Sequence, residues 1–89
     1  MKAILTVIGK DQVGIIAAVC VHLASYNVNV LDISQTIMQE YFTMIMLVDA
    51  GAATVPFAQL KEELAAAGQA RNLDIRIQRE DIFNAMHRI

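Results

Sequence analysis

The chain has 89 residues, of which 56% are hydrophobic, and its seven basic and nine acidic residues leave a net charge of −2. This length allows one small domain. The scattered basic residues exclude the concentrated positive surface of a nucleic-acid-binding protein, and the single cysteine excludes an internal disulfide and a CxxC metal or redox motif. Without a membrane-spanning apolar stretch or a visible signal peptide, we expect a cytoplasmic protein with no membrane partner. The high apolar content of so small a domain also predicts an oligomer.

The first quarter of the chain predicts a strand, a turn and a helix. Residues 2–8 are apolar on both faces, which is typical of a central strand. Residues 9–12 are a polar turn, and Asp11 is expected to cap a helix over residues 13–26. Asn27, which tolerates a left-handed conformation, is expected to end that helix. The predicted buried stripe consists of Ile16, Val19, Cys20 and Leu23, with Ile15 at its edge.

Two consecutive strands are expected next, over residues 28–39 and 42–48, with a hairpin at residues 40–41 that lacks the usual Asn-Gly signal. Strict alternation in the first strand puts five residues on one face, namely Asn29, Leu31, Ile33, Gln35 and Ile37. The second strand is apolar on both faces, with Phe42, Met44, Met46 and Val48 on one and Ile45 and Leu47 on the other.

The last part of the chain predicts a helix, a strand and a short tail helix. Thr54 or Val55 is expected to cap the helix, Pro56 to lie in its first turn, and Gly68 to follow its end. Its predicted buried stripe is Phe57, Leu60, Leu64 and Ala67. Residues 73–79 alternate cleanly, with Leu73, Ile75 and Ile77 pointing inwards. A tail helix over residues 80–87 follows.

The order of these elements is β-α-β-β-α-β. It predicts an α+β fold, the ferredoxin-like βαββαβ sandwich, in which two helices cover one face of a four-stranded antiparallel sheet. We expect a single domain over residues 1–89, with a core of residues 1–79 and a C-terminal helical tail of residues 80–89. The second face of the sheet would be bare and apolar, so the tail helix or a partner subunit must cover it.

The segment between residues 4 and 16 is the most informative for function. A strand that feeds a helix through a short turn aims the free N–H groups of the helix at one spot, where they suit an anion such as a carboxylate. Gly14 leaves room there for a ligand or a second backbone to approach. The same residues also have purely structural explanations: Asp11 as a helix cap, and Gly14 as a turn or helix-packing residue.

This arrangement resembles the ACT domain, a small regulatory module of amino-acid metabolism. The common ACT pattern after the first strand is Asp-x-Pro-Gly-Leu/Ile, which Asp11, Gly14 and Ile15 match, while Val13 stands where proline is usual. The run from residue 29 to residue 35, followed by Phe42-Thr43-Met44, resembles more closely the glycine-cleavage repressor and the N-terminal domain of formyltetrahydrofolate deformylase.

The resemblance implies a regulatory protein that binds a small amino acid or related metabolite between the subunits of a homodimer or higher homo-oligomer, and that modulates a partner enzyme or regulator. The implied ligand-binding residues are Asp11, Gln12, Val13, Gly14 and Ile15 of one subunit and Asn29 of the other. At the start of a strand, Asn29 is otherwise an ordinary polar edge residue. Valine at position 13 leaves the turn less rigid than proline would.

A binding role is preferred to catalysis, and no cofactor or metal is expected. Cys20 and His22 have no further ligand at metal-binding spacing, and neither histidine has a nucleophile near it in the sequence. Acylphosphatases share the fold but need an arginine in the first turn, which here holds only Lys10. The alternative is a structural module for protein–protein interaction, or dimerisation, without a working ligand site.

Overall fold

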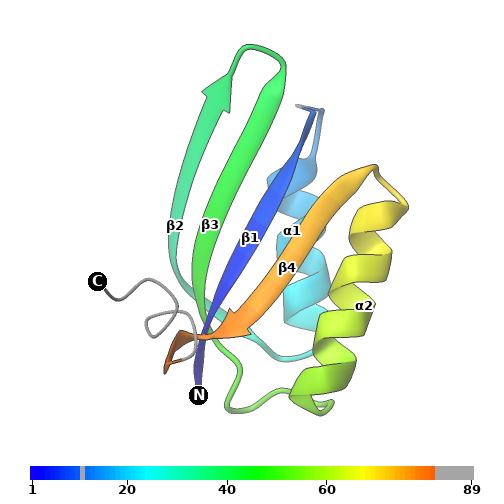
Figure 1. Ribbon diagram of the computed structural model, residues 1–89. Helices are drawn as coiled ribbons and strands as arrows, with labels where there is room; N and C mark the ends of the chain where they lie inside the picture. The colour runs from blue at the N-terminus through cyan, green and yellow to red at the C-terminus, as the bar shows by residue number, and fades with distance from the viewer. Residues whose placement is uncertain (11, 82–89) are drawn as a thin grey trace.

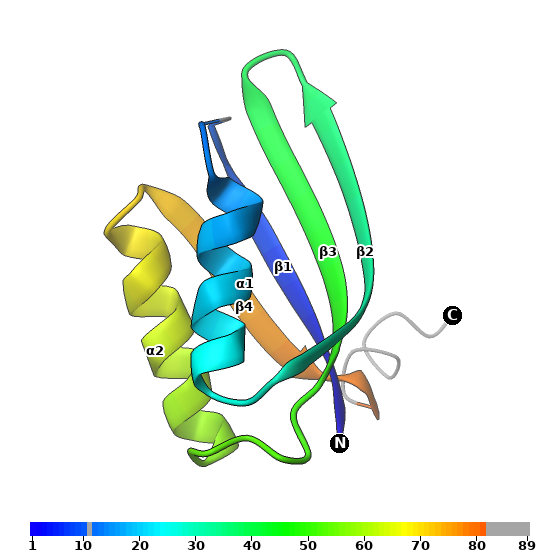
Figure 2. The same ribbon diagram turned by 180° about the vertical axis from the view of Figure 1, so that it is seen from behind.

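The computed structural model describes residues 1–10 and 12–81. Its elements are β1 (Lys2–Lys10), α1 (Ile15–Ser25), β2 (Asn29–Met38), β3 (Tyr41–Asp49), α2 (Phe57–Gln69) and β4 (Leu73–Arg79). The strands form one antiparallel sheet in the order β2-β3-β1-β4. Both helices lie on the same face of this sheet, behind it in Figure 1 and in front of it in Figure 2. The predicted ferredoxin-like βαββαβ fold is therefore confirmed.

The hydrophobic core lies between the sheet and the two helices. Alternate residues of the two central strands supply its floor, which consists of Ala3, Leu5 and Val7 of β1 and Phe42, Met44, Met46 and Val48 of β3. Leu60 and Leu64 of α2 and the predicted inward set of β4, Leu73, Ile75 and Ile77, are also buried. The alternation predicted for β3 and β4 is confirmed, and β1 is central as its two apolar faces indicated.

Helix α1 begins later than predicted and turns a different residue to the core. Gly14 occupies the N-cap position, so residue 13 precedes the helix. The buried residues are Ile15, Val19 and Leu23, which recur every fourth position, while Ile16 and Cys20 are only half-buried. The prediction that Ile15 lies at the edge of the stripe was wrong, because the face that packs on the sheet is the one on which Ile15, Val19 and Leu23 follow one another at four-residue spacing.

The C-terminal end of α1 is closed by backbone hydrogen bonds, as predicted from Asn27. This residue has φ 60°, in the left-handed region. Its N–H donates to the carbonyl of Ala24 at 3.0 Å, and the N–H of Val28 donates to that of Leu23 at 2.9 Å. This pair of bonds is the Schellman arrangement, which satisfies carbonyls that would otherwise have no partner. The Asn27 side chain adds a bond to the carbonyl of Ala52 at 3.0 Å.

Strand β2 departs from the alternation predicted for it. Its register against β3 shifts between Val30 and Asp32, so Leu31 is an extra residue in a β-bulge. Val30 consequently shares the helix-covered face with Ile33, and Asn29 lies on the opposite face. The hairpin turn is Gln39-Glu40, one residue earlier than predicted, because Met38 pairs with Tyr41 and Gln39 takes φ 57°.

Both ends of α2 also differ from the prediction. Pro56, rather than Thr54 or Val55, is the N-cap residue, and the helix continues to Gln69, past Gly68. Gly68 is buried in the last turn, where a Cβ atom would lie 2.7 Å from the carbonyl oxygen of Leu73 and 2.8 Å from Cγ1 of Ile75. The glycine is there because α2 packs closely on β4, not because the helix ends.

Two predicted features fall on residues outside the described part of the chain. Asp11 is one of them, so its predicted capping role is not tested. The other is the tail helix, since residues 82–89 also lie outside it. Within residues 1–10 and 12–81, neither helix has the length and apolar character needed to cross a bilayer.

Candidate functional site

A hollow of about 250 Å³ opens between the start of α1 and the hairpin end of β2 and β3. Its walls are Gln12, Gly14, Ile15, Ile16 and Ala17 on one side and Gln35, Ile37 and Phe42 on the other. The hairpin ends of β2 and β3 extend past the start of α1 (Figure 2), so the helix-facing side of β2 is left uncovered there. Ile37 is accordingly 56% exposed although its strand partner Phe42 is buried. The hollow is thus partly apolar and open to solvent.

The first turn of α1 presents unpaired donors to this hollow. Gly14 has φ 81° and ψ 15°, and its carbonyl accepts the first helical hydrogen bond from the N–H of Ala18 at 2.9 Å. The N–H groups of Ile15, Ile16 and Ala17 have no partner inside an α-helix that starts here. Among the described residues, no side chain caps them, and the first turn contains no acidic residue. Free N–H groups at the positive end of a helix dipole attract an anion.

Gly14 is required by the turn and not by packing. A Cβ atom at this position would meet no atom of the described residues within 4 Å, so the glycine permits no close contact with them. Its positive φ, however, is a conformation that residues with a side chain rarely adopt. Among the described residues, nothing fills the space beside Gly14.

Gln12 holds the other end of the turn in place. Its side-chain Nε2 donates to the carbonyl of Arg71, in the connection between α2 and β4, at 2.9 Å. This bond fixes the side chain at the rim of the hollow and leaves its carbonyl oxygen as a possible acceptor for a ligand ammonium group. Val13, by contrast, is 98% exposed and does not line the hollow.

The structure brings together only part of the predicted site. Gln12, Gly14 and Ile15 meet at the hollow, whereas Asn29 lies at the far end of β2 from the hairpin, paired with Asp49. Within one protomer Asn29 and the hollow are therefore separate. Asp11, the remaining predicted residue, lies outside the described part of the chain.

Sequence reasoning missed the second wall of the hollow. Gln35, Ile37 and Phe42 line it, and so do Ile16 and Ala17 of α1. The alternation in β2 already places Gln35 and Ile37 on one face, but an apolar residue on an alternating strand is normally assigned to the core. What distinguishes these two residues is that the hairpin extends past the helix, and only the three-dimensional arrangement shows this.

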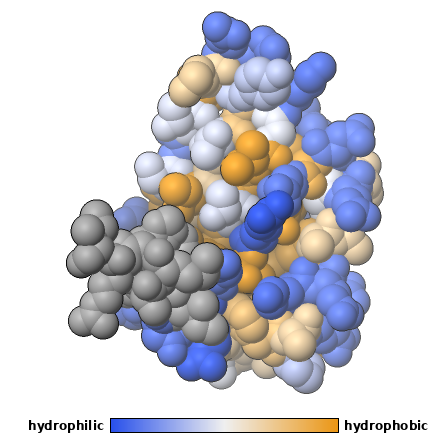
Figure 3. Space-filling view, viewed as in Figure 1, coloured by the Kyte–Doolittle hydropathy of each residue, from blue (hydrophilic) through white to orange (hydrophobic). Residues whose placement is uncertain are grey.

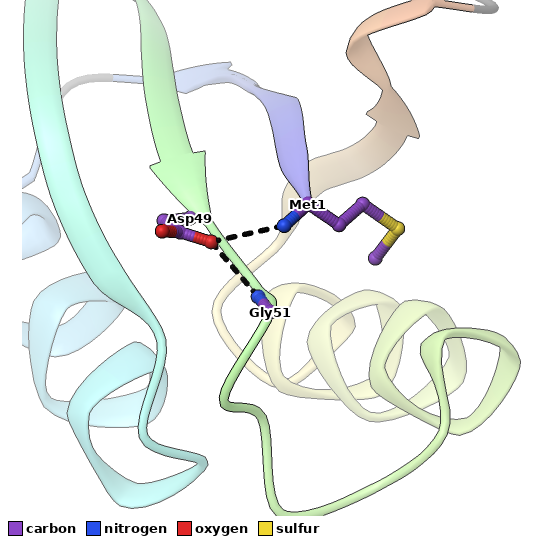
Figure 4. A network of polar contacts seen from close by, with 3 residues as sticks. All are labelled: Met1, Asp49 and Gly51. Atoms are coloured by element: carbon purple, nitrogen blue, oxygen red, sulfur yellow. Dashed lines mark hydrogen bonds and ion pairs between the residues drawn. The ribbon is translucent and has the colours of Figure 1, made fainter.

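Asp49 organises the opposite end of the sheet (Figure 4). Its Oδ1 accepts a hydrogen bond from the N–H of Gly51 at 2.9 Å and lies 3.2 Å from the terminal ammonium group of Met1. These two donors, the Gly51 bond first, lower the pKa of the Asp49 carboxyl below its ordinary value. The backbone adds a bond from the N–H of Ala50 to the carbonyl of Met1 at 2.8 Å. The polar groups at this end are engaged with one another.

The described residues contain no cluster of three or more histidine, cysteine, aspartate or glutamate side chains suited to a metal ion. Cys20 lies in the middle of α1 and His22 in its last turn, and neither lines the hollow. The chemistry available at the hollow is therefore that of backbone N–H donors, the two amide side chains of Gln12 and Gln35, and an apolar wall.

The amino-acid sequence matches the ACT domain family over residues 2–78. A UPF0237 protein from Clostridium acetobutylicum is 58% identical over 89 residues, which cover all of both chains. Among solved structures, an ACT domain protein from Streptococcus pneumoniae is 46% identical, with a TM-score of 0.83 and coverage of 93% of each chain.

The more specific resemblance also has counterparts among solved structures. A formyltetrahydrofolate deformylase from Pseudomonas syringae is 25% identical with a TM-score of 0.79, and the match covers 88% of this chain but only 27% of the deformylase. A putative glycine cleavage system transcriptional repressor shares the fold, with 22% identity, a TM-score of 0.72 and coverage of 86% of this chain and 44% of the repressor. The predicted resemblance is confirmed.

Proposed function

This chain belongs to the ACT-domain family, and we propose that it is a stand-alone regulatory protein that binds a small amino acid or related metabolite between two copies of itself. A ligand held at a subunit interface favours the assembled state that binds it best. A partner enzyme or regulator then responds to the shift between assembled states. The proposed action is binding and not catalysis, because the described lining of the hollow offers donors and apolar surface but no nucleophile with a base beside it.

The observation that carries this proposal is the hollow at the start of α1, where no side chain of the described residues caps the helix. Its volume of about 250 Å³ is below the roughly 300–1,000 Å³ of pockets for drug-sized molecules, so it suits a smaller ligand. The N–H groups of residues 15–17 would receive a carboxylate, and Ile37 would contact an aliphatic side chain. The Gln12 carbonyl oxygen would accept a hydrogen bond from an ammonium group, because its Nε2 is already bonded to Arg71.

The openness of the hollow supports the participation of a second copy. Val13 projects into solvent beside it, and Ile37 and Met38 on the neighbouring strand end are also exposed. Strand β2 is an edge strand in which every residue but Val30 is exposed. A long unpaired edge with apolar side chains invites pairing with another chain. If β2 pairs antiparallel with β2 of a second copy, the start of the partner strand lies beside the end of this one.

Asn29 enters the proposal only through that partner. It begins β2, so antiparallel pairing of two β2 strands would bring it from the second copy towards Ile37 and Met38 of the first. It lies on the sheet face opposite to the hollow, so its amide would approach the ligand around the edge of the strand. We therefore rank Asn29 below Gln12 and the α1 N–H groups as a ligand contact.

The alternative, a protein–protein interaction module without a ligand, is favoured by one observation. Val13, which takes the place of the usual proline, is almost completely exposed, and an exposed apolar residue on a turn suits a protein partner. Both proposed functions use the same end of the molecule, so the location of the surface does not distinguish them. An increase in stability on addition of a ligand does, because only the ligand-binding function predicts it.

The first test is thermal unfolding with a panel of free amino acids at millimolar concentration. A ligand at about a hundredfold its dissociation constant adds roughly 2.7 kcal/mol to the free energy of unfolding, and each kcal/mol raises the Tm of so small a domain by roughly 4–8 °C. One or two amino acids should produce a clear shift. If none does, the interaction module becomes the better proposal.

Two substitutions of Ala17 locate the site. Ala17 lines the hollow in the first turn of α1. Ala17→Glu places a carboxylate beside the free N–H groups, which favours the helix dipole but repels a ligand carboxylate. The variant should be at least as stable as the parent and should lose the ligand-induced rise in Tm. Ala17→Gln, which has the same size without the charge, should keep more of that rise. Equal responses of the two variants would place the ligand elsewhere.

A further inference from the structure

A groove of about 530 Å³ follows the outer edge of β4, the strand at the opposite side of the sheet from β2. Residues 72–76, at the start of β4, line it on one side, and Ala65 and Gln69, one turn apart on α2, line it on the other. Because consecutive residues of the strand contribute, both faces of β4 reach the groove. The groove therefore lies against the edge of the sheet and not over either face.

The backbone along this edge has hydrogen-bonding groups without a strand partner. Strand β4 pairs with β1 on its inner side and with no other strand of the described residues. In an antiparallel sheet, alternate residues of an edge strand direct their N–H and C=O groups outwards. A row of such groups is a template on which another extended chain can pair. The groove thus offers the donors and acceptors that an added strand requires.

Helix α2 covers the groove from the helix side of the sheet. In Figures 1 and 2 it lies beyond β4, on the side away from β1, so it extends past the edge of the sheet. Close packing holds its last turn against the strand, since a Cβ atom on Gly68 would lie 2.7 Å from the carbonyl oxygen of Leu73. A strand added beside β4, at the usual spacing of about 4.8 Å, would lie beneath this helix and pass the small side chain of Ala65.

The position of α2 decides between the possible occupants. Two folded copies paired through their β4 edges would each bring an α2 helix over the strand of the other. Paired strands lie about 4.8 Å apart, whereas packed helices need roughly 8–10 Å between their axes, so the two helices would collide. An extended segment without a helix packed on it meets no such obstacle. The groove therefore suits a segment of a different protein.

The charges on the edge specify the chemistry of that segment. Asp74 and Arg76 lie on the sheet face away from the helices, since Ile75 between them is buried in the core. Their side chains pair with each other at 3.2 Å but remain 53% and 78% exposed. An exposed ion pair contributes little stability, so it can be exchanged for pairs with another chain. An antiparallel segment matches these charges with an acidic residue opposite Arg76 and, two positions later, a basic residue opposite Asp74.

We propose that the groove between α2 and β4 binds an extended segment of a partner protein as a fifth strand of the sheet, antiparallel to β4. The segment has an acidic and a basic residue at positions i and i+2 on the face away from the helices, and apolar residues at the alternate positions, beneath α2. Figure 3 shows both hydrophilic and apolar surface along this margin of the molecule. Main-chain hydrogen bonds supply the affinity, and the order of the charges supplies the selectivity.

A hydrogen bond joins the groove to the hollow at the start of α1. Gln12, which lines the hollow, donates to the carbonyl of Arg71 at 2.9 Å, and the next two residues, Asn72 and Leu73, line the groove. A ligand that draws Gln12 towards itself loosens this bond, so ligand and segment should alter each other's affinity by the same factor. This coupling rests on the proposed function. The docking does not, because the groove lies at the opposite edge of the sheet from β2.

The docking is tested by fluorescence anisotropy with two labelled peptides of the same composition, Thr-Val-Glu-Val-Lys-Val-Thr and Thr-Val-Lys-Val-Glu-Val-Thr. The full chain should bind the first about tenfold more tightly, because both cross-strand pairs become repulsive with the second. A double variant, Asp74→Lys with Arg76→Glu, should prefer the second peptide. The proposal is overturned if the chain binds neither peptide or if the exchange of charges does not reverse the preference. A parent chain that prefers the second peptide overturns the antiparallel direction.

Two alanine substitutions on α2 test where the peptide binds. Ala65→Gln fills part of the groove, whereas Ala66→Gln, the matched control, changes the next residue, which is exposed and does not line the groove. The first variant should bind the Glu-Val-Lys peptide several-fold more weakly than the parent, and the second should bind it equally well. Equal binding by the two variants would place the peptide elsewhere and overturn the proposal.

The two other possible occupants give different results. Arg76→Glu should leave the mass of the chain unchanged in sedimentation equilibrium, because a change would mean that a second copy uses this edge. A chain without residues 82–89 should bind the peptide like the parent. Peptide binding that appears only after this deletion would mean that the deleted segment fills the groove. Either of these contrary results overturns the proposal.

The coupling is tested by repeating the peptide titration with an amino acid that raises the Tm. The peptide affinity should change in its presence, and the change should be smaller in Gln12→Ala, which lacks the bond to Arg71. An unchanged affinity would contradict the coupling and leave the docking intact. If no amino acid raises the Tm, the proposed function fails, and the peptide results still decide the docking.

Discussion

The two ends of helix α1 both depend on a residue with positive φ, but they differ in whether their backbone groups have hydrogen-bond partners. At the C-terminal end, Asn27 completes a Schellman arrangement and its side chain bonds to the loop before α2. At the N-terminal end, no described atom lies within 4 Å of a Cβ position on Gly14, and no described side chain bonds to the free N–H groups. One end is complete within the protomer. At the other, the donors have no side-chain partner among the described residues, which is the property expected of a binding site.

The strongest test of this contrast is Asn27→Ala. The substitution removes the side-chain bond to the carbonyl of Ala52, worth about 1 kcal/mol or less at an exposed position, and puts alanine in a left-handed conformation, which costs roughly 1–2 kcal/mol relative to the right-handed one. We expect a loss of about 2 kcal/mol in the free energy of unfolding, measured by urea denaturation. Asn27→Gly, which removes only the bond, should lose clearly less. Equal losses would mean that the conformation contributes nothing.

The matching change at the open end is Gly14→Ala. Here the alanine meets no atom, so the cost is that of the left-handed backbone alone, roughly 1 kcal/mol, and the loss should be smaller than for Asn27→Ala. Gly14→Asn should retain more stability, because asparagine tolerates this conformation better. A loss from Gly14→Ala larger than that from Asn27→Ala would show that this end is already packed, and would contradict the open-site interpretation.

The sequence predicted the elements where local rules decide the structure. Residues 73–79 alternate without exception and form β4 over that range, and Asn27 takes the left-handed conformation expected of it. The errors occur where a contact between distant segments decides. The closeness of Leu73 makes Gly68 a packing residue within α2, and pairing with β3 creates the bulge at Leu31.

The candidate site divides in the same way. The strand-turn-helix pattern was enough to predict that Gln12, Gly14 and Ile15 lie together, because they are adjacent in sequence. Gln35 and Ile37 reach the same hollow only through the order of the sheet and the length of the hairpin. Nothing in the sequence alone indicates that the end of β2, which is half polar, lies opposite the start of α1, 18 or more residues away in the chain.

The smallest expected effect on stability comes from Asp49, at the end of the sheet opposite the hollow. It appears as a dependence of the free energy of unfolding on pH. Hydrogen bonding to Gly51 and the nearby Met1 ammonium group lower the Asp49 pKa in the folded chain below its ordinary value of 3.8. A carboxyl whose pKa is lower when folded contributes stability that is present above the unfolded pKa and is lost as the pH falls through the folded pKa. Stability should therefore decrease as the pH is lowered from about 5 through 3.8 and below. Asp49→Asn should reduce the slope of that decrease while changing the stability near pH 7 only modestly. Urea denaturation of both chains at several pH values measures the two slopes, and parallel curves would show that Asp49 is not held by these contacts in solution.

No described acidic side chain caps the first turn of α1. Without a ligand, we therefore assign the acid dependence to Asp49, at the end of the sheet opposite the hollow. An added carboxylate ligand should introduce a second acid-sensitive step, at the open end.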